Sequence, residues 1–254
     1  MVKAAAYPEH WLETVQFHRR FAEHDLNEWL REQLAPEPHH TFLDIGCGMG
    51  EQLLYFAPVC KRCIGVDNAE LPLRKLAAII QDQNIGNVEW LYCPGECISL
   101  DDSTVDLVAC NFALPYMNAK EVLSEIRRLL TKGGRSIITG YAISNVAEMI
   151  AIHRDNCPYV VPGYINGFCD AGRFADVAHR IFSRVEQRTW TNPMRFPRVA
   201  DFMQYYTHTD LYMGAKDMVD DLATLVAATA QAVLSRDGEI RITKVISALY
   251  LANE

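Results

Sequence analysis

The feature that most constrains the fold is the stretch FLDIGCGMGEQ at residues 42–52, where an apolar run meets a glycine-rich turn and a helical pattern follows. Glycines at positions 46, 48 and 50 bring the backbone close to whatever ligand the turn binds. Such a ligand could be a dinucleotide, a phosphate group or a molecule without phosphate. The stretch therefore predicts a ligand site where a strand passes into a helix.

The residues of this turn favour a cationic ligand. A dinucleotide site of the G-x-G-x-x-G type requires a third glycine where Glu51 stands, and the Gly-Lys-Ser/Thr sequence of a phosphate-binding P-loop is absent. The strand before the turn also contains Asp44. A carboxylate there would repel a pyrophosphate and attract an ammonium group.

Apolar strand-like runs alternate with helical patterns along much of the chain, which favours a parallel sheet covered by helices on both faces. We expect strands at 41–45, 63–67, 88–92, 105–110, 135–140 and 183–191, and a last strand within 238–252. We expect helices within 9–34, near 51–58, at 71–84, from Asn118 to the Gly133-Gly134 pair, and at 217–235. The predicted fold is α/β, a doubly wound, Rossmann-like, seven-stranded and mostly parallel sheet.

We expect one domain over 1–254 with four parts. Residues 1–40 would form a helical cap, 41–140 the cofactor-binding core, 141–212 a substrate lid with the sixth strand, and 213–254 the final helix and strand. The lid region is aromatic-rich and long for a connection, which is typical of a segment over a substrate. The last helix is expected to be capped by Asp217 and to face inward with Met218, Leu222, Leu225, Val226 and Val233.

Charge and apolar patterning limit the classes of partner. A net charge of −8 without a clustered basic face argues against a nucleic-acid partner. The first residues lack the apolar core of a secretion signal, and no stretch approaches the roughly 18 apolar residues of a membrane span. We therefore expect a cytoplasmic protein, a monomer or homodimer, with a small-molecule partner and no membrane partner.

The cysteines are expected to be reduced thiols. Cys60 and Cys63 open one predicted strand, whereas Cys93 and Cys97 follow the end of another. If those strands are parallel neighbours, the two pairs lie roughly 15 Å apart, too far to share a zinc ion. We predict no metal site.

Four ordered motifs carry a family resemblance. The segment LDIGCGMG resembles the first motif of class I S-adenosylmethionine-dependent methyltransferases, in the subgroup similar to the ubiquinone/menaquinone C-methyltransferases (type 11). The segments CIGVDNAE, YCPGECISLDDSTVDLV and LLTKGGRSIITGY resemble the later motifs and follow in the family's order. The resemblance covers about residues 41–140 and implies methyl transfer from S-adenosyl-L-methionine, with S-adenosyl-L-homocysteine as the product. The acceptor would be an O, N or C atom of a small molecule, attacked by in-line displacement.

The same resemblance implies the roles of individual residues. Asp67 would hold both ribose hydroxyls, Glu96 with the Cys97 N–H would meet the adenine edge, and Asp44 would orient the site through the loop backbone or water. Asn111 and Phe112 would border the methionine end and the methyl group. The expected cofactor-binding set is Asp44, Gly46, Cys47, Gly48, Gly50, Asp67, Asn68, Glu96, Cys97, Asn111 and Phe112.

The sequence motifs say less about which residues contact the methyl acceptor. Tyr116, Tyr164 and Tyr205 are candidate substrate contacts, although aromatic side chains in such a region more often pack the lid. The catalytic residue is unknown, because His10, His18, His153 and His208 are each more often packing or surface residues. The alternatives are a non-catalytic cofactor-fold binding module and, less favoured, an RNA or protein methyltransferase or a nicotinamide-dependent dehydrogenase.

Overall fold

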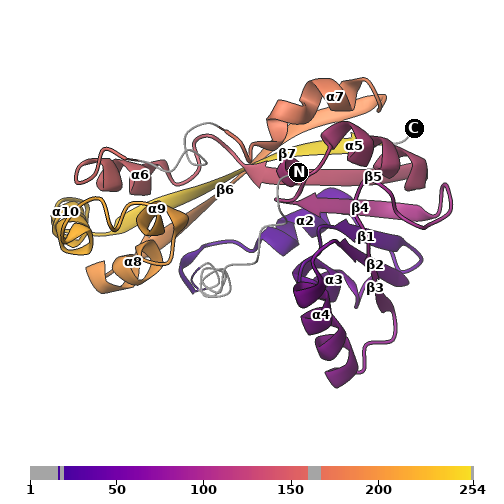
Figure 1. The fold of residues 1–254 in the computed structure, drawn as a ribbon, viewed down its shortest axis with the longest axis horizontal. Coiled ribbons are helices and arrows are strands. Elements are labelled where there is room, and N and C mark those ends of the chain that lie inside the picture. Colours follow the sequence, from indigo (N-terminus) through magenta and orange to yellow (C-terminus); the bar gives the residue numbers. More distant parts are fainter. Residues whose placement is uncertain (1–16, 18–19, 160–166, 253–254) are drawn as a thin grey trace.

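The computed structural model describes residues 17, 20–159 and 167–252 of the chain. Its centre is a seven-stranded sheet in the order β3-β2-β1-β4-β5-β7-β6, in which β7 runs antiparallel to both of its neighbours (Figure 1). The strands are β1 (Thr41–Ile45), β2 (Arg62–Asp67), β3 (Val88–Tyr92), β4 (Val105–Asn111), β5 (Leu130–Tyr141), β6 (Arg184–Phe196) and β7 (Ile240–Ala252). The doubly wound, mostly parallel sheet predicted from the sequence is confirmed.

Helices cover both faces of the sheet, with α5 and α7 on one side and α2, α3 and α4 on the other (Figure 1). The α-helices are α2 (Leu26–Leu34), α3 (Glu51–Phe56), α4 (Glu70–Asp82), α5 (Ala119–Leu129), α6 (Ala147–Arg154), α7 (Ala175–His179), α8 (Val199–Tyr206), α9 (Asp210–Met213) and α10 (Leu222–Asp237). The short 3-10 helices are η1 (Leu114–Tyr116) and η3 (Ala171–Phe174). Within the described residues, no helix is both long and apolar enough to cross a bilayer.

Each face of the sheet has its own buried core, because strand side chains alternate between the faces. Leu43 and Val108 pack under α5 and α7, whereas Phe42 and Leu107, one position away on the same strands, pack under α2, α3 and α4. Strands buried on both faces are apolar throughout, which is why these runs could be recognised in the sequence.

The long strands β6 and β7 extend beyond the rest of the sheet and carry a second group of helices. Figure 1 shows α6, α8, α9 and α10 gathered around the far ends of these two strands. We call these helices with residues 192–196 and 240–244 the distal lobe. Its buried core includes Phe196, Phe202, Tyr206, Val226 and Ile242. Much of the region expected to form a lid is therefore a packed lobe with a core of its own.

The sixth strand is longer than predicted. It continues past residue 191, through Pro193, and ends at Phe196. The strand can pass through Pro193 because β6 is an edge strand, where a proline without an N–H is tolerated. The Pro193 carbonyl accepts a hydrogen bond from Glu23 N at 3.1 Å, so the segment before α2 covers part of this edge.

The last helix begins later than predicted. α10 starts at Leu222, and its N-cap residue Asp221 has a φ of 53° and no side-chain capping bond. Met218 lies before the helix and is 57 % exposed, and Leu225 is 41 % exposed, so neither belongs to the buried face. The predicted cap at Asp217 and the predicted burial of Met218 and Leu225 were wrong, whereas Leu222 and Val226 of the same predicted face are buried.

The junction between α5 and β5 also differs from the prediction. Asn118 caps α5 as expected, since its side chain accepts from Glu121 N, but the helix ends at Leu129. β5 pairs with β4 at Leu130 and again from Arg135 onward, with a register irregularity between. Gly133 has a left-handed conformation (φ 80°) and lies within this irregularity of the strand. It therefore does not end the helix.

Candidate cofactor and acceptor site

The glycine loop is held against the end of β2 by backbone bonds. Gly46 N and Cys47 N both donate to Val66 O, at 2.7 and 3.0 Å, and Gly50 N donates to Cys47 O at 2.9 Å. Gly46 has a φ of 75°, and a Cβ added there would lie 2.4 Å from the Cβ of Ala113. The loop therefore requires glycine at this position both for its conformation and for its close contact with the end of β4.

Asp67 ends β2 and is 9 % exposed. Its Oδ2 accepts from Gly48 N and its Oδ1 from Ala69 N, each at 2.8 Å. Each carboxylate oxygen keeps a further lone pair for a ligand. Asp67 thus positions the glycine loop and still has the capacity for the two hydroxyl hydrogen bonds that the resemblance implies.

Asp44 is buried on β1 at 1 % exposure, and neither of its carboxyl oxygens has a hydrogen-bond partner within the described residues. Burial first, and then the charges of Asp67 and Glu51, raise the pKa of Asp44 to about 8. The expected orienting contact to the loop backbone is not formed, because Asp67 makes that contact. Asp44 is instead a buried acid that a cationic group could ionise.

Asn111 and Phe112 follow one another at the end of β4. The Asn111 Oδ1 accepts from the Thr139 hydroxyl at 2.8 Å, while its Nδ2 has no partner within the described residues. Phe112 has a φ of 57°, uncommon outside glycine, and its ring stacks on Tyr141 at a centroid distance of 4.6 Å. The chain thus holds an amide donor and an aromatic pair at the carboxyl ends of the central strands, where parallel sheets bind ligands.

The residues predicted for adenine lie at the edge of this group. Glu96 is half-buried, and its Oε1 accepts from Asn118 N at 2.9 Å. Cys97 is exposed, and its N–H, expected to meet the adenine edge, donates to Pro94 O at 3.2 Å. Asn68, beside the end of β2, is exposed. The Glu96 carboxylate keeps an unused oxygen for a ligand, whereas the Cys97 N–H is engaged in its own turn.

The three tyrosines named as substrate contacts have different surroundings. Tyr116 is 46 % exposed, and partial burial beside Cys169 raises its pKa to about 12. Tyr205 is 4 % exposed and stacks on Phe196 in the core of the distal lobe, with ring centroids 5.7 Å apart. Tyr164 lies outside the described residues. Tyr116 is therefore placed to meet a ligand, whereas the Tyr205 ring is committed to packing.

Lys244 was not singled out by the sequence reasoning. It is 8 % exposed on β7, and its Nζ lies 5.6 Å from the centre of the Tyr141 ring. Burial lowers its pKa to about 7, opposed by the nearby charge of Glu51. The alternation of the strand could have indicated its burial. Lys244 lies two residues from both Ile242 and Ile246, so its side chain is on the same, buried side of the strand as theirs.

The candidate histidines are structural where they are described. His153 is fully buried, with Nδ1 2.6 Å from the Tyr206 hydroxyl and Nε2 2.7 Å from Tyr159 O. His208 lies in the turn after α8, and its Nδ1 is 2.6 Å from Gln204 O of that helix. His10 and His18 lie outside the described residues. These contacts place no described candidate histidine beside the glycine loop.

The predicted separation of the cysteine pairs is confirmed in the sheet. β2 and β3 are parallel neighbours, with Cys63 opposite Val88 at their amino ends, and Cys93 follows the end of β3. All eight cysteines are free. The two pairs therefore lie at opposite ends of the strands.

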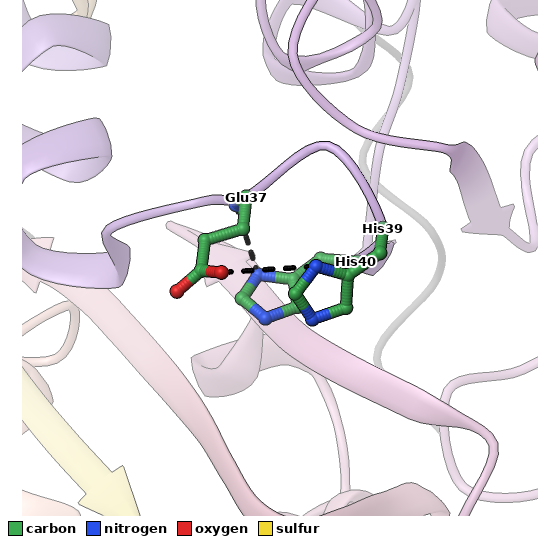
Figure 2. A group of neighbouring side chains, drawn as sticks. All are labelled: Glu37, His39 and His40. Carbon is green, nitrogen blue, oxygen red and sulfur yellow. Dashed lines mark hydrogen bonds and ion pairs between the residues drawn. The ribbon is translucent and has the colours of Figure 1, made fainter.

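One group of potential metal ligands lies in the turn before β1, made of Glu37, His39 and His40 (Figure 2). Their ligand atoms lie within 4.8 Å of one another. The His40 Nδ1 already accepts from Glu37 N at 3.0 Å, and Glu37 and His39 are exposed. This group lies at the amino end of β1, away from the glycine loop, and its present contacts are those of a side chain that closes a turn. The prediction of no metal site stays a prediction.

Comparisons with known proteins point to one family. Residues 43–138 match the methyltransferase domain family. Rat thiol S-methyltransferase TMT1B is 32 % identical over 98 residues, which cover 37 % of this chain and 39 % of the relative. The human thiol S-methyltransferase TMT1A is 25 % identical over 107 residues, 41 % of this chain and 44 % of the relative. The chain thus spans about two fifths of the length of these curated relatives.

Solved structures share the fold over most of the chain. The YcgJ protein of Bacillus subtilis has a TM-score of 0.59 at 15 % identity and covers 90 % of this chain and 97 % of its own. A geranyl diphosphate C-methyltransferase of Streptomyces coelicolor, solved with S-adenosyl-L-homocysteine, has a TM-score of 0.52 at 15 % identity, over 96 % and 80 % of the two chains. Residues 43–138 therefore match the methyltransferase domain family, and the chain shares the Rossmann-like α/β fold of these solved structures.

Proposed function

We propose that this chain transfers a methyl group from S-adenosylmethionine to a small-molecule acceptor. The observation that carries the proposal is the pair of buried, unpartnered polar groups beside the glycine loop, Asp44 and the Nδ2 of Asn111. Buried polar groups without partners are rare, because each costs free energy until a ligand or water satisfies it. A carboxyl and an amide donor together are complementary to the ammonium and carboxylate of an amino-acid moiety.

Each end of the donor would be held by a different part of the site. Asp67 would accept hydrogen bonds from the two ribose hydroxyls, and Glu96 would accept from the adenine amino group. Phe112, turned by its positive φ, would border the sulfur and exclude water from it. The bound donor supplies a methyl group on a positively charged sulfur, which is a good leaving group.

The acceptor is proposed to be a small molecule with an apolar or aromatic part. Tyr116, Tyr141 and Phe168 provide aromatic surface near the end of β5 and in the segment before η3. The names of the thiol S-methyltransferases add sulfur to the O, N and C atoms considered from the sequence. A cytoplasmic location and a monomeric or homodimeric state remain predictions.

Two measurements test the proposal. Isothermal titration calorimetry should show S-adenosylhomocysteine binding and no binding of NAD(H), and labelled S-adenosylmethionine incubated with a host extract should yield a methylated small molecule. Binding without any methylated product would support the alternative of a non-catalytic binding module. Label found on RNA or protein would favour the macromolecular alternative, and the absence of S-adenosylhomocysteine binding would remove the proposed function.

A further inference from the structure

A surface cavity of about 350 Å³ lies at the amino ends of β1 and β2, beside α2. It is lined by side chains from α2, from the turn before β1 and from the connection between α3 and β2: Arg31, Pro36, Pro38, Pro58, Val59 and Cys60. The proline and valine side chains are apolar, while Arg31 adds a positive charge and Cys60 a thiol. The cavity therefore leads to a nucleophilic atom at the end of the strands opposite to the glycine loop.

The thiol in this cavity has a second thiol beside it. Cys60 is 6 % exposed, and Cys63, near the start of β2, is fully buried. The Cys63 thiol donates a hydrogen bond to the Cys60 sulfur. The two sulfur atoms are therefore in contact, and Cys60 is the member of the pair that lines the cavity.

Asn87, in the connection before β3, holds the backbone of both cysteines. Its Nδ2 donates to Cys60 O at 3.0 Å, and its backbone oxygen accepts from Cys63 N at 2.8 Å. Between the two cysteines, Lys61 N donates to His40 O at 3.0 Å. A disulfide requires two cysteines whose side chains already point toward each other. The fixed backbone of residues 60–63 meets this condition.

The groups around the pair make Cys60 the better nucleophile. The hydrogen bond from Cys63 lowers the pKa of Cys60, although burial and the charge of Asp106 act against it. The same hydrogen bond, burial and the charge of Asp44 raise the pKa of Cys63. The Asp106 carboxylate is itself engaged, because its oxygens accept from residues 41 and 131. The thiolate is the form of cysteine that attacks a disulfide, so Cys60 would react first.

We propose that Cys60 and Cys63 form a second reactive site, a dithiol that exchanges with a small, carboxylate-bearing disulfide entering the cavity. Cys60 attacks the oxidant, Cys63 resolves the mixed disulfide, and the Arg31 guanidinium attracts a carboxylate of the oxidant. Disulfides in reducing compartments are usually transient and redox-sensing, which is the role that fits a pair found here as free thiols. The inference does not depend on the proposed function, since the pair lies at the opposite end of β2 from Asp67.

The step conserves atoms and electrons. The Cys60 thiolate bonds to one sulfur of the oxidant while the oxidant's sulfur–sulfur bond breaks, and the first thiolate leaves with that electron pair. The Cys63 thiol loses its proton, and its sulfur bonds to the Cys60 sulfur, which expels the second thiolate. The protons of the two cysteines end on the two released thiols. The protein loses two electrons and the oxidant gains two.

Thiol mapping of the folded, full-length protein tests the inference. The protein is incubated with glutathione disulfide and quenched with acid, its remaining thiols are alkylated, and its peptides are identified by mass spectrometry. We expect a disulfide between Cys60 and Cys63 and no glutathione on either. Cys97 is exposed and should take up glutathione, whereas Cys157, buried in the core of the distal lobe, should stay reduced. Free thiols at residues 60 and 63 in protein whose Cys97 has reacted would overturn the inference.

Two cysteine variants test the order of attack. In Cys63→Ser, Cys60 should keep one glutathione, because the thiol that resolves the mixed disulfide is missing. In Cys60→Ser, Cys63 should stay reduced, because it is fully buried. Glutathione on Cys63 in this variant would overturn the role of Cys60.

Two arginine variants test the charge in the cavity. Arg31→Met should slow the reaction with glutathione disulfide about tenfold and leave the reaction with uncharged bis(2-hydroxyethyl) disulfide unchanged. Arg127→Met removes an exposed arginine from α5, on the other face of the sheet, and should react as the wild type. Equal slowing of Arg31→Met with both disulfides would overturn the role given to the Arg31 charge.

The wild type alone decides if a variant does not fold. A disulfide at residues 60 and 63 that forms in the folded protein and is reversed by dithiothreitol supports the inference. Glutathione that stays on Cys60 while Cys63 is free, or a disulfide that forms only in denaturant, would overturn it. Failure to bind S-adenosylhomocysteine would overturn the proposed function and leave this inference standing.

Discussion

The buried acid Asp44 on β1 and the buried base Lys244 on β7 both respond to burial, but their pKa values shift in opposite directions. Burial raises the pKa of Asp44 to about 8, and it lowers the pKa of Lys244 to about 7. In both cases the ligand-free protein is shifted toward the uncharged form of the group. The difference teaches that the same burial favours the protonated form of an acid and the deprotonated form of a base, and that a cationic group beside Asp44 would restore its charge.

The largest loss of cofactor affinity is expected from substitution of Asp67. Its carboxylate already accepts hydrogen bonds from Gly48 N and Ala69 N. Asp67→Ala should weaken S-adenosylhomocysteine binding by about 3 kcal/mol, because the bonds to the ribose and the bond that positions Gly48 are lost together. Calorimetry measures the change. Asp82→Asn, at the exposed end of α4, is the matched control and should bind normally. An unchanged affinity in Asp67→Ala would remove this residue from the donor side.

Asp44 should couple cofactor binding to proton release. With a pKa of about 8 it is mostly protonated at pH 7, and a bound ammonium group would ionise it. Binding of S-adenosylhomocysteine at pH 7 should therefore release about one proton. Calorimetry in buffers of different ionisation enthalpy measures this number. Asp44→Asn should bind without that release, and equal release by both proteins would show that another group titrates.

The same residue should affect the stability of the ligand-free protein. Between about pH 4 and pH 8 the folded protein keeps a proton on Asp44 that the unfolded chain has lost, so stability falls as the pH rises through this window. Asp44→Asn should therefore raise the free energy of unfolding by about 2 kcal/mol at pH 8, with the gain vanishing toward pH 4. Urea denaturation at a series of pH values tests this. A gain that is the same at every pH would exclude titration of Asp44 as its cause.

The surroundings of the two groups also differ in how far the sequence predicts them. The donor side is built from neighbours in sequence at the ends of predicted strands, so Asp67 and Asn111 could be placed from strand order alone. What the sequence could not give was the division of roles between Asp44 and Asp67, because that depends on which carboxylate reaches the Gly48 N–H. Asp67 makes this bond, and Asp44 is left without one.

The surroundings of Lys244 depend on contacts between segments far apart in the chain. Lys244 meets Tyr141 only because β7 inserts antiparallel between β5 and β6, about a hundred residues after β5 ends. The distal lobe was missed for a related reason. A strand is expected to contain proline only at the edge of a sheet, and the edge position of β6 is a property of the whole topology.

Lys244 should show the opposite dependence of stability on pH from Asp44. Between about pH 7 and 10.5 the unfolded chain binds a proton that the folded protein lacks, so stability rises with pH in this window. Lys244→Met should therefore stabilise the ligand-free protein most below pH 7, by about 1.5 kcal/mol, with a gain that declines toward pH 10. Denaturation of both variants over the same pH range compares the two groups directly. Gains that grow in the same direction would contradict the opposite action of burial on the two groups.

The smallest change in stability is expected in the distal lobe, where the buried side chains of His153 and Tyr206 are hydrogen-bonded to each other. The His153 Nε2–H donates to Tyr159 O, so its Nδ1 accepts from the Tyr206 hydroxyl at 2.6 Å. Tyr206→Phe should lower the free energy of unfolding by about 1 kcal/mol, because the ring nitrogen loses its donor. Tyr92→Phe, at an exposed position, should leave stability unchanged.

The distal-lobe variant also sharpens the comparison with Asp44, whose oxygens have no partner within the described residues. If unsatisfied burial marks ligand-binding groups, removing a satisfied bond should change stability without changing S-adenosylhomocysteine affinity, and Tyr206→Phe should bind within about twofold of the wild type. A tenfold loss of affinity would mean that the distal lobe contributes to the donor side. The distal lobe would then belong to the proposed cofactor site, together with the carboxyl ends of the central strands.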